Sequence, residues 1–149
     1  MESCANLLHD PRFGQPRSRA LLFDIGGGST EIAWVRTDSG RKTESLIGYL
    51  SLPVGVITLS EQFGPVHALD DQVYRRMVAH TRELLRDFES VHRIGSAIRR
   101  EQARLIGTSG TATTLASPIL KLPRHARSVA DGSPLPSSRA SLVVRILRK

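Results

Sequence analysis

The sequence predicts an α/β fold, in which short strands come first and a long helix then packs against them. Residues 21–25 form an apolar run closed by three glycines, which is typical of a buried strand entering a turn. Between residues 74 and 88, apolar side chains recur at spacings of three and four, so they form one stripe on a helix. A second short apolar run at 103–107 returns the chain to a strand and completes the α/β pattern.

Three strands open the predicted fold. They are expected at residues 21–25, 31–36 and 45–52, and only short stretches rich in turn residues separate them. Strands joined by such tight turns form a meander. Trp34 and Tyr49 lie within these strand patterns, so we expect them to pack in the sheet rather than to stack on nucleic-acid bases.

The helices follow the meander. Residues 54–63 are expected to form a short helix or turn that caps it, and Asp70 is a plausible N-cap for the long helix. After the strand at 103–107, residues 112–115 have a helical composition. The side of the long helix opposite the apolar stripe is expected to face solvent, since it carries Arg75, Arg76, Arg82, Arg86, Asp87 and Glu89.

Composition excludes several classes of protein. The 149 residues are 40% hydrophobic and 23% charged, which is ordinary globular usage and fits neither a fibrous nor a wholly disordered chain. The apolar runs are only a few residues long, so a membrane-spanning helix is not expected. Cys4 is the only cysteine, which excludes an internal disulfide framework and a thiolate metal site. With no secretory signal at the start, a cytoplasmic, reducing setting is the expectation.

The net charge of +7 is concentrated near one end of the chain. Residues 21–117 hold 11 basic and 11 acidic side chains, whereas residues 118–149 hold seven basic and one acidic. A neutral middle argues against a basic face built into the fold, so no dedicated nucleic-acid site is expected. A module that binds anions through its basic tail remains an alternative.

The first glycine turn, residues 26–29, follows a strand that carries Asp24 near its end. Successive backbone N–H groups in such a turn form an anion-binding concavity, and Asp24 is placed to bind a hydrated Mg²⁺ or to orient a water. No lysine follows the glycines as in a P-loop, and the glycine spacing of the dinucleotide fingerprint is absent. A plain glycine-rich hairpin remains the alternative. The candidate phosphate-binding residues are Gly26, Gly27, Gly28, Ser29 and Thr30.

The second turn, residues 107–111, also follows a strand but leads into a helix. A helix N-terminus with free N–H groups is an anion site by geometry, although a simple strand-to-helix connection is the alternative. Both turns would lie at the carboxyl ends of neighbouring strands, where ligands bind in open α/β sheets. The candidate residues are Gly107, Thr108, Ser109, Gly110 and Thr111.

The segment LLFDIGGGSTE, residues 21–31, resembles the second phosphate motif of the exopolyphosphatase and guanosine pentaphosphate phosphatase family (Ppx/GppA). The resemblance continues in SLPVGVITLSE, residues 51–61, and in IGTSGTATTLA, residues 106–116. It covers about residues 20–132 and then stops. The fold it implies is a ribonuclease-H-like half of the fold shared by actin, sugar kinases and Hsp70-type ATPases, in truncated form.

The activity that the resemblance implies is a Mg²⁺-dependent phosphohydrolase that removes terminal phosphate from inorganic polyphosphate or from guanosine pentaphosphate (pppGpp). By this analogy Asp24 binds the cation or positions the attacking water. Gly26, Gly27, Gly28 and Ser29 hold phosphate oxygens, and residues 107–111 line the far side of the same cleft. A homodimer is compatible with the resemblance.

The chain also departs from the family. Its relatives are longer, and their catalytic glutamate lies upstream of the DIGGGSTE string, in a segment with no counterpart here. We therefore expect a fragment with three parts: an irregular segment at 1–19, the α/β domain at 20–132, and a basic tail at 133–149. The alternative to an active phosphohydrolase is an inactive remnant of the fold, or a phosphate-binding module without turnover.

Overall fold

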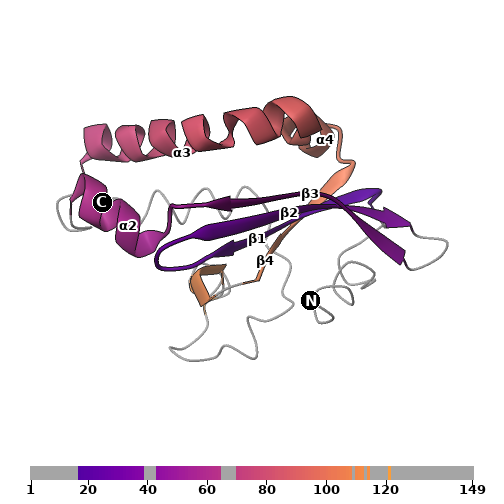
Figure 1. The fold of residues 1–149 in the computed structure, drawn as a ribbon, viewed down its shortest axis with the longest axis horizontal. Helices are drawn as coiled ribbons and strands as arrows, with labels where there is room; N and C mark the ends of the chain where they lie inside the picture. Colours follow the sequence, from indigo (N-terminus) through magenta and orange to yellow (C-terminus); the bar gives the residue numbers. More distant parts are fainter. Residues whose placement is uncertain are drawn as a thin grey trace.

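The computed structural model describes residues 17–38, 43–64, 70–108, 110–112, 114 and 121. These residues form a four-stranded sheet with helices over one face, as Figure 1 shows. The predicted α/β class is therefore confirmed. In chain order the elements are β1 (Arg19–Ile25), β2 (Thr30–Asp38), β3 (Thr43–Leu52), α2 (Val56–Phe63), α3 (Asp71–His92), α4 (Ile94–Arg99) and β4 (Ala103–Gly107).

The sheet has the strand order β3-β2-β1-β4. The predicted meander is confirmed, since β1 pairs antiparallel with β2 and β2 pairs antiparallel with β3. β4 runs parallel to β1, with Phe23 opposite Gly107. The carboxyl ends of β1 and β4 therefore lie side by side, so the two glycine-containing turns begin at the same edge of the sheet.

The helices α2, α3 and α4 cover the same face of the sheet. Ile32, Leu52 and Val54 form a buried cluster against which apolar side chains of α2 and α3 pack. A second cluster joins Trp34 to Ile94 and Ala97 of α4. The opposite face carries a smaller cluster around Ala20 and Val35, to which only strand residues contribute within the described part of the chain.

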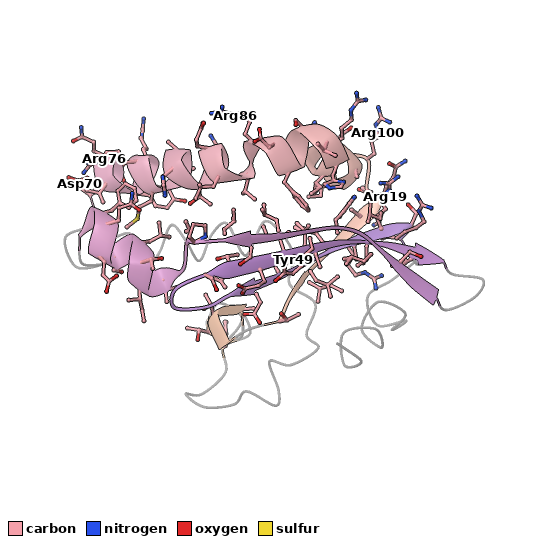
Figure 2. The ribbon with its side chains drawn as sticks, viewed as in Figure 1. Arg19, Tyr49, Asp70, Arg76, Arg86 and Arg100 are labelled. Atoms are coloured by element: carbon pink, nitrogen blue, oxygen red, sulfur yellow. The ribbon has the colours of Figure 1, made fainter. Side chains whose placement is uncertain are left out.

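The long helix α3 begins as expected. The carboxylate of Asp70 accepts a hydrogen bond from the backbone N–H of Val73 (2.7 Å), which satisfies one of the free donors at the helix start. The charged residues predicted to face solvent are exposed, and Figure 2 shows Arg76 and Arg86 on the side of α3 that faces away from the sheet. α3 ends at His92. The next residue, Arg93, has a left-handed backbone (φ 51°) and turns the chain into α4. The sequence pattern does not foresee α4.

The two strand aromatics differ in their surroundings. Trp34 is fully buried and lies between the sheet and α4, as predicted, although its indole N–H has no hydrogen-bond partner among the described residues. Tyr49 is 59% exposed, so the expectation that it packs within the sheet is wrong. Alternation along β3 explains the difference, because Tyr49 pairs with Ala33 on the face of the sheet that the helices leave open.

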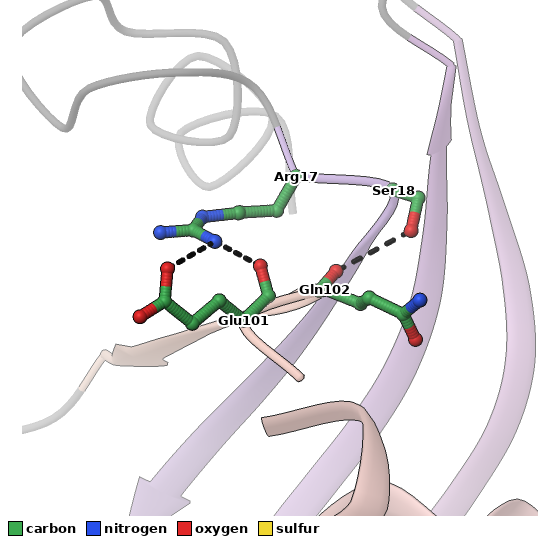
Figure 3. A network of polar contacts seen from close by, with 4 residues as sticks. All are labelled: Arg17, Ser18, Glu101 and Gln102. Atoms are coloured by element: carbon green, nitrogen blue, oxygen red, sulfur yellow. Dashed lines mark hydrogen bonds and ion pairs between the residues drawn. The ribbon is translucent and has the colours of Figure 1, made fainter. Parts of the chain in front are cut away.

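The starts of β1 and β4 are joined by polar contacts, which Figure 3 shows from close by. The guanidinium of Arg17 donates to the backbone carbonyl of Glu101 and also contacts its carboxylate (3.4 Å). The hydroxyl of Ser18 donates to the carbonyl of Gln102 (3.4 Å). These contacts link the starts of β1 and β4 at the end of the sheet opposite the glycine turns.

Several expectations concern residues that the structure does not describe. The irregular segment at 1–19 is described only from Arg17 onward, and the basic tail at 133–149 lies outside the described residues. Among the helices of the described residues, none is long and apolar enough to cross a membrane.

Candidate functional site at the ends of β1 and β4

The first glycine turn joins β1 to β2 as a tight hairpin. The backbone N–H of Gly26 donates to the carbonyl of Ser29 (2.9 Å), so Gly27 and Gly28 form the tip. Within the described part of the chain, the backbone N–H groups of Gly27, Gly28 and Ser29 donate no hydrogen bond. Gly28 is exposed, and a Cβ added there would meet nothing within 4 Å. The turn therefore offers free backbone donors at an accessible tip, as an anion site requires.

The carbonyl groups of this turn are engaged by α2. The backbone N–H of Val56 donates to Gly26 (3.0 Å), and that of Ile57 donates to Gly27 (2.8 Å). Gly55 precedes this helix and lies so close to the turn that an added Cβ would be 2.5 Å from the carbonyl oxygen of Gly26. The predicted short helix at 54–63 thus holds the first glycine turn as well as capping the meander.

Asp24 lies at the carboxyl end of β1, directly across the strand pair from Glu31. Side chains that face each other in an antiparallel pair project from the same face of the sheet, with Cβ atoms about 4.5–5.5 Å apart. Here that face is the one opposite the helices, since Leu21 and Phe23 of β1 pack toward α2 and α3. Asp24 is half-buried, and its carboxylate makes no hydrogen bond or ion pair with another described residue.

Glu31 has well-defined partners. Its Oε1 accepts hydrogen bonds from the hydroxyl of Ser29 (2.7 Å) and from that of Ser51 on β3 (3.2 Å). Neither Glu31 nor Ser51 is among the site residues predicted from the sequence. The signal was nevertheless present for Glu31, because a hairpin whose tip is at Gly27 and Gly28 must place residue 31 opposite residue 24.

The second turn is fastened to β1 by two threonines. The backbone N–H and the hydroxyl of Thr108 both donate to the carbonyl of Phe23 (3.0 and 3.3 Å), and the hydroxyl of Thr111 donates to that of Ile25 (2.7 Å). The structure thus brings the two turns together, as the sequence predicts. Gly110 and Thr111 lie in a helical stretch, while Ser109 lies outside the described residues.

Four of the predicted hydroxyl groups already donate hydrogen bonds within the fold. Besides Thr108, Thr111 and Ser29, the hydroxyl of Thr30 donates to the carbonyl of Val54 (2.6 Å). Each hydroxyl has one proton to donate, so these side chains hold the turns in place through that proton. Among the described residues of the first glycine turn, the backbone N–H groups of Gly27, Gly28 and Ser29 remain available as donors.

The donor set suits a hard cation. Asp24 and Glu31 provide carboxylate oxygens, which Mg²⁺ prefers, and one or two carboxylates are enough when phosphate oxygens and waters complete its coordination. Two carboxylates directly opposite each other repel unless a cation or proton lies between them. Among the described residues, no group of three or more acidic, histidine or cysteine side chains gathers at one place.

A cavity elsewhere in the described part of the fold is separate from these groups. It has a volume of about 570 Å³ and lies between α3 and the sheet. Its lining is mainly apolar and includes Leu21, Leu85 and Phe88, which belong to the helix-covered face. Asp24 and the glycine turns do not line this cavity.

Comparison with known proteins identifies relatives of this arrangement. The model of the Ppx/GppA phosphatase family matches residues 12–132, which is most of the chain. The crystal structure of an exopolyphosphatase-like protein is 28% identical, with a TM-score of 0.57, and the match covers 89% of this chain and 40% of that one. The Ppx/GppA enzyme of Aquifex aeolicus is 22% identical, with a TM-score of 0.50, and the match covers 78% of this chain and 33% of that one.

These matches bear on the fold and on the extent of the chain. They confirm the predicted fold class, a partial actin-type fold whose β3-β2-β1-β4 sheet has the ribonuclease-H-like order. This chain spans no more than two fifths of the length of either structure. It therefore corresponds to one part of the proteins that it resembles.

Proposed function

This chain belongs to the Ppx/GppA phosphatase family, and on that premise we propose that it carries one wall of a phosphohydrolase site. The first glycine turn holds phosphate oxygens, and the Asp24–Glu31 pair holds a divalent cation beside them. The reaction is the removal of a terminal phosphate from a phosphate anhydride. Phosphoryl transfer depends mainly on positioning and on stabilising charge, and these groups are suited to both tasks.

One observation carries the proposal: free backbone donors and a pair of facing carboxylates occur at the same end of β1. Gly27 and Gly28 lie at the hairpin tip, and their N–H groups donate no hydrogen bond to any other described residue. Asp24 and Glu31 lie opposite each other in the same hairpin, each three residues from the tip along its strand. A phosphate held by the N–H groups would thus bind beside a cation held by the carboxylates, which is how enzymes neutralise the charge of a polyphosphate.

Mg²⁺ is the cation that fits this oxygen donor set. When bound, it would neutralise charge on the phosphate oxygens. The chain's own residues orient the groups that react. The N–H groups of the turn orient the terminal phosphate, and Ser29 and Ser51 hold the Glu31 carboxylate through their hydroxyls.

For the substrate we propose inorganic polyphosphate or pppGpp. A relative of 28% identity is an exopolyphosphatase-like protein, which supports a phosphate chain as the substrate. Both candidates end in a phosphate anhydride, which is the group that the proposed site would hold.

Phosphate binding without turnover is the second candidate. It is supported by the donor set, because the two carboxylates that face each other at the turn are both assigned to the cation. A general base would then have to come from another part of the protein.

The test is release of phosphate from the full chain. We expect purified protein with Mg²⁺ to release inorganic phosphate from tripolyphosphate, and Asp24→Asn and Glu31→Gln each to lower the rate at least tenfold. Glu61→Gln is the matched control, because Glu61 is an exposed acid on α2 away from the carboxylate pair. Substituting pppGpp for tripolyphosphate in the same assay distinguishes the substrates.

The second candidate has its own signature. If the chain binds phosphate without turnover, calorimetric titration would show Mg²⁺-dependent binding of tripolyphosphate that Asp24→Asn weakens, and the assay would detect no release of phosphate. If the chain neither binds nor hydrolyses tripolyphosphate, or if both properties survive Asp24→Asn and Glu31→Gln, the proposed function is wrong.

A further inference from the structure

The start of α2 is in contact with the first glycine turn through backbone groups. The N–H groups of Ile57 and Thr58 both donate to the carbonyl of Gly27 (2.8 and 3.3 Å), and that of Val56 donates to Gly26 (3.0 Å). These are donors that the first turn of a helix leaves without partners inside the helix. The glycine carbonyls therefore cap α2, and α2 in return fixes two peptide planes of the turn.

Fixing those carbonyls also fixes the N–H groups beyond them. The described peptide bonds are trans, so the carbonyl of one residue and the N–H of the next point in opposite directions. Because the carbonyls of Gly26 and Gly27 point toward α2, the N–H groups of Gly27 and Gly28 point away from it. Two consecutive N–H groups are thereby held on one side of the turn, as in an anion-binding concavity.

Gly55 makes this approach possible. An added Cβ at residue 55 would lie 2.5 Å from the carbonyl oxygen of Gly26 and closer still to that of Gly27. The obstacle is backbone rather than a flexible side chain, so an alanine would force the turn and the helix start apart.

Thr58 holds Gly55 in place. Its hydroxyl oxygen accepts a hydrogen bond from the backbone N–H of Gly55 (2.7 Å), as the third residue of a helix does in a capping box. The hydroxyl of Thr30 fastens the preceding residue through the carbonyl of Val54 (2.6 Å). The segment 54–58 is therefore tied to the hairpin on both sides of Gly55.

We propose that Gly55 and Thr58 are positioning residues, which aim the N–H groups of Gly27 and Gly28 at the terminal phosphate. The phosphate part of this inference rests on the proposed function, whereas the orientation of the turn does not. Neither residue contacts the phosphate; each acts through the glycine carbonyls that α2 binds.

The test combines nuclear magnetic resonance of the full chain with titration of Mg²⁺ and tripolyphosphate. Gly55→Ala is expected to shift the amide resonances of Gly27 and Gly28 and to weaken tripolyphosphate binding by on the order of tenfold. Thr58→Val, which removes only the hydroxyl, is expected to act in the same direction but more weakly. Thr58→Ser keeps the hydroxyl and should restore both properties.

Gly95→Ala is the matched control. It makes the same change on α4, where an added Cβ meets only the side chains of Glu89 and Arg99, and it should leave the turn resonances and the affinity as they are. If Gly55→Ala does not fold, the comparison of Thr58→Val with Thr58→Ser carries the test.

The outcomes separate this inference from the proposed function. Unchanged Gly27 and Gly28 resonances in Gly55→Ala and Thr58→Val overturn the inference, whatever the chain binds. Shifted resonances with unchanged tripolyphosphate affinity also overturn it, because the orientation of the turn would then not set binding. If the unmodified chain binds no tripolyphosphate, the proposed function fails, and the amide resonances alone decide whether α2 orients the turn.

Discussion

Asp24 and Glu31 are two carboxylates that the fold places directly opposite each other. Like charges at facing positions of an antiparallel pair destabilise the sheet, by an amount comparable to the 0.2–1 kcal/mol that favourable pairs contribute. Glu31 is partly compensated by the hydroxyls of Ser29 and Ser51, while Asp24 has no polar partner among the described residues. The arrangement thus costs stability unless a cation binds.

Asp24→Asn should therefore have opposite effects without and with Mg²⁺. Without the cation, the variant is expected to be more stable than the unmodified chain by a few tenths of a kcal/mol, up to about 1 kcal/mol, because the repulsion is removed. At free Mg²⁺ ten times its dissociation constant, the unmodified chain gains about 1.4 kcal/mol and the variant gains much less. Urea unfolding with and without Mg²⁺ measures both effects.

Glu61→Gln serves as the control in this experiment also. It should change neither the unfolding free energy without Mg²⁺ nor the gain on adding Mg²⁺ by more than about 0.5 kcal/mol. A variant Asp24→Asn that is less stable without Mg²⁺, and that responds to Mg²⁺ like the unmodified chain, would contradict the assignment of a cation to this pair.

At the scale of elements, β4 and the turn after it are held against β1 by more than strand pairing. Thr108 and Thr111 donate to carbonyl groups at the end of β1, in Phe23 and Ile25. Gly107 leaves room for this packing, since an added Cβ would lie 2.7 Å from the Cβ of Ala112 and 3.0 Å from the ring of Phe23. The absence of a side chain at residue 107 therefore determines how closely the second turn approaches β1.

Gly107→Ala is expected to destabilise the chain by about 1–3 kcal/mol, as overpacking does elsewhere. Denaturant unfolding followed by circular dichroism gives the value. Gly28→Ala is the control, because a Cβ at that position would meet nothing within 4 Å, and its unfolding free energy should stay close to that of the unmodified chain. Equal unfolding free energies for the two variants would show that close packing at Gly107 is not needed.

At the scale of the whole molecule, α2, α3 and α4 stabilise one face of the sheet, and the carboxylates of the proposed site lie on the other. Phe88 of α3 packs against both buried clusters on the helix-covered face. Asp24 and Glu31 project from the opposite face, and α2 holds the first glycine turn through the carbonyls of Gly26 and Gly27. Stability and chemistry therefore depend largely on different side chains.

Phe88→Ala should lower the unfolding free energy by about 2–3 kcal/mol, somewhat less than truncation of a fully buried phenylalanine, because Phe88 is half-buried. Urea unfolding followed by Trp34 fluorescence measures the loss. Val91→Ala on the same helix should cost no more than about 0.5 kcal/mol, since Val91 is 73% exposed. A loss of similar size in both variants would contradict the role of Phe88 in joining the two clusters.

Much of the fold could be predicted from the sequence because it depends on local patterns. The apolar run before the glycines, the stripe on α3 and the capping carboxylate of Asp70 each act within a few residues, and all three are confirmed. α4 was not predictable in this way. It begins after the left-handed backbone of Arg93, and two of its residues, Ile94 and Ala97, are buried beside Trp34, so tertiary packing favours it.

For the site, the sequence by itself determined that Asp24 lies near the end of a strand and that three glycines follow this strand, since that requires only the order of residues along the chain. Only the tertiary structure decided that Thr108 and Thr111 fasten a distant turn to β1, and that α2 holds the carbonyls of Gly26 and Gly27. The physical reason is that these are contacts between backbone and side-chain groups on different strands and helices. Their geometry depends on strand register and on how closely a helix approaches the sheet, and neither quantity is encoded in the pattern of any one segment.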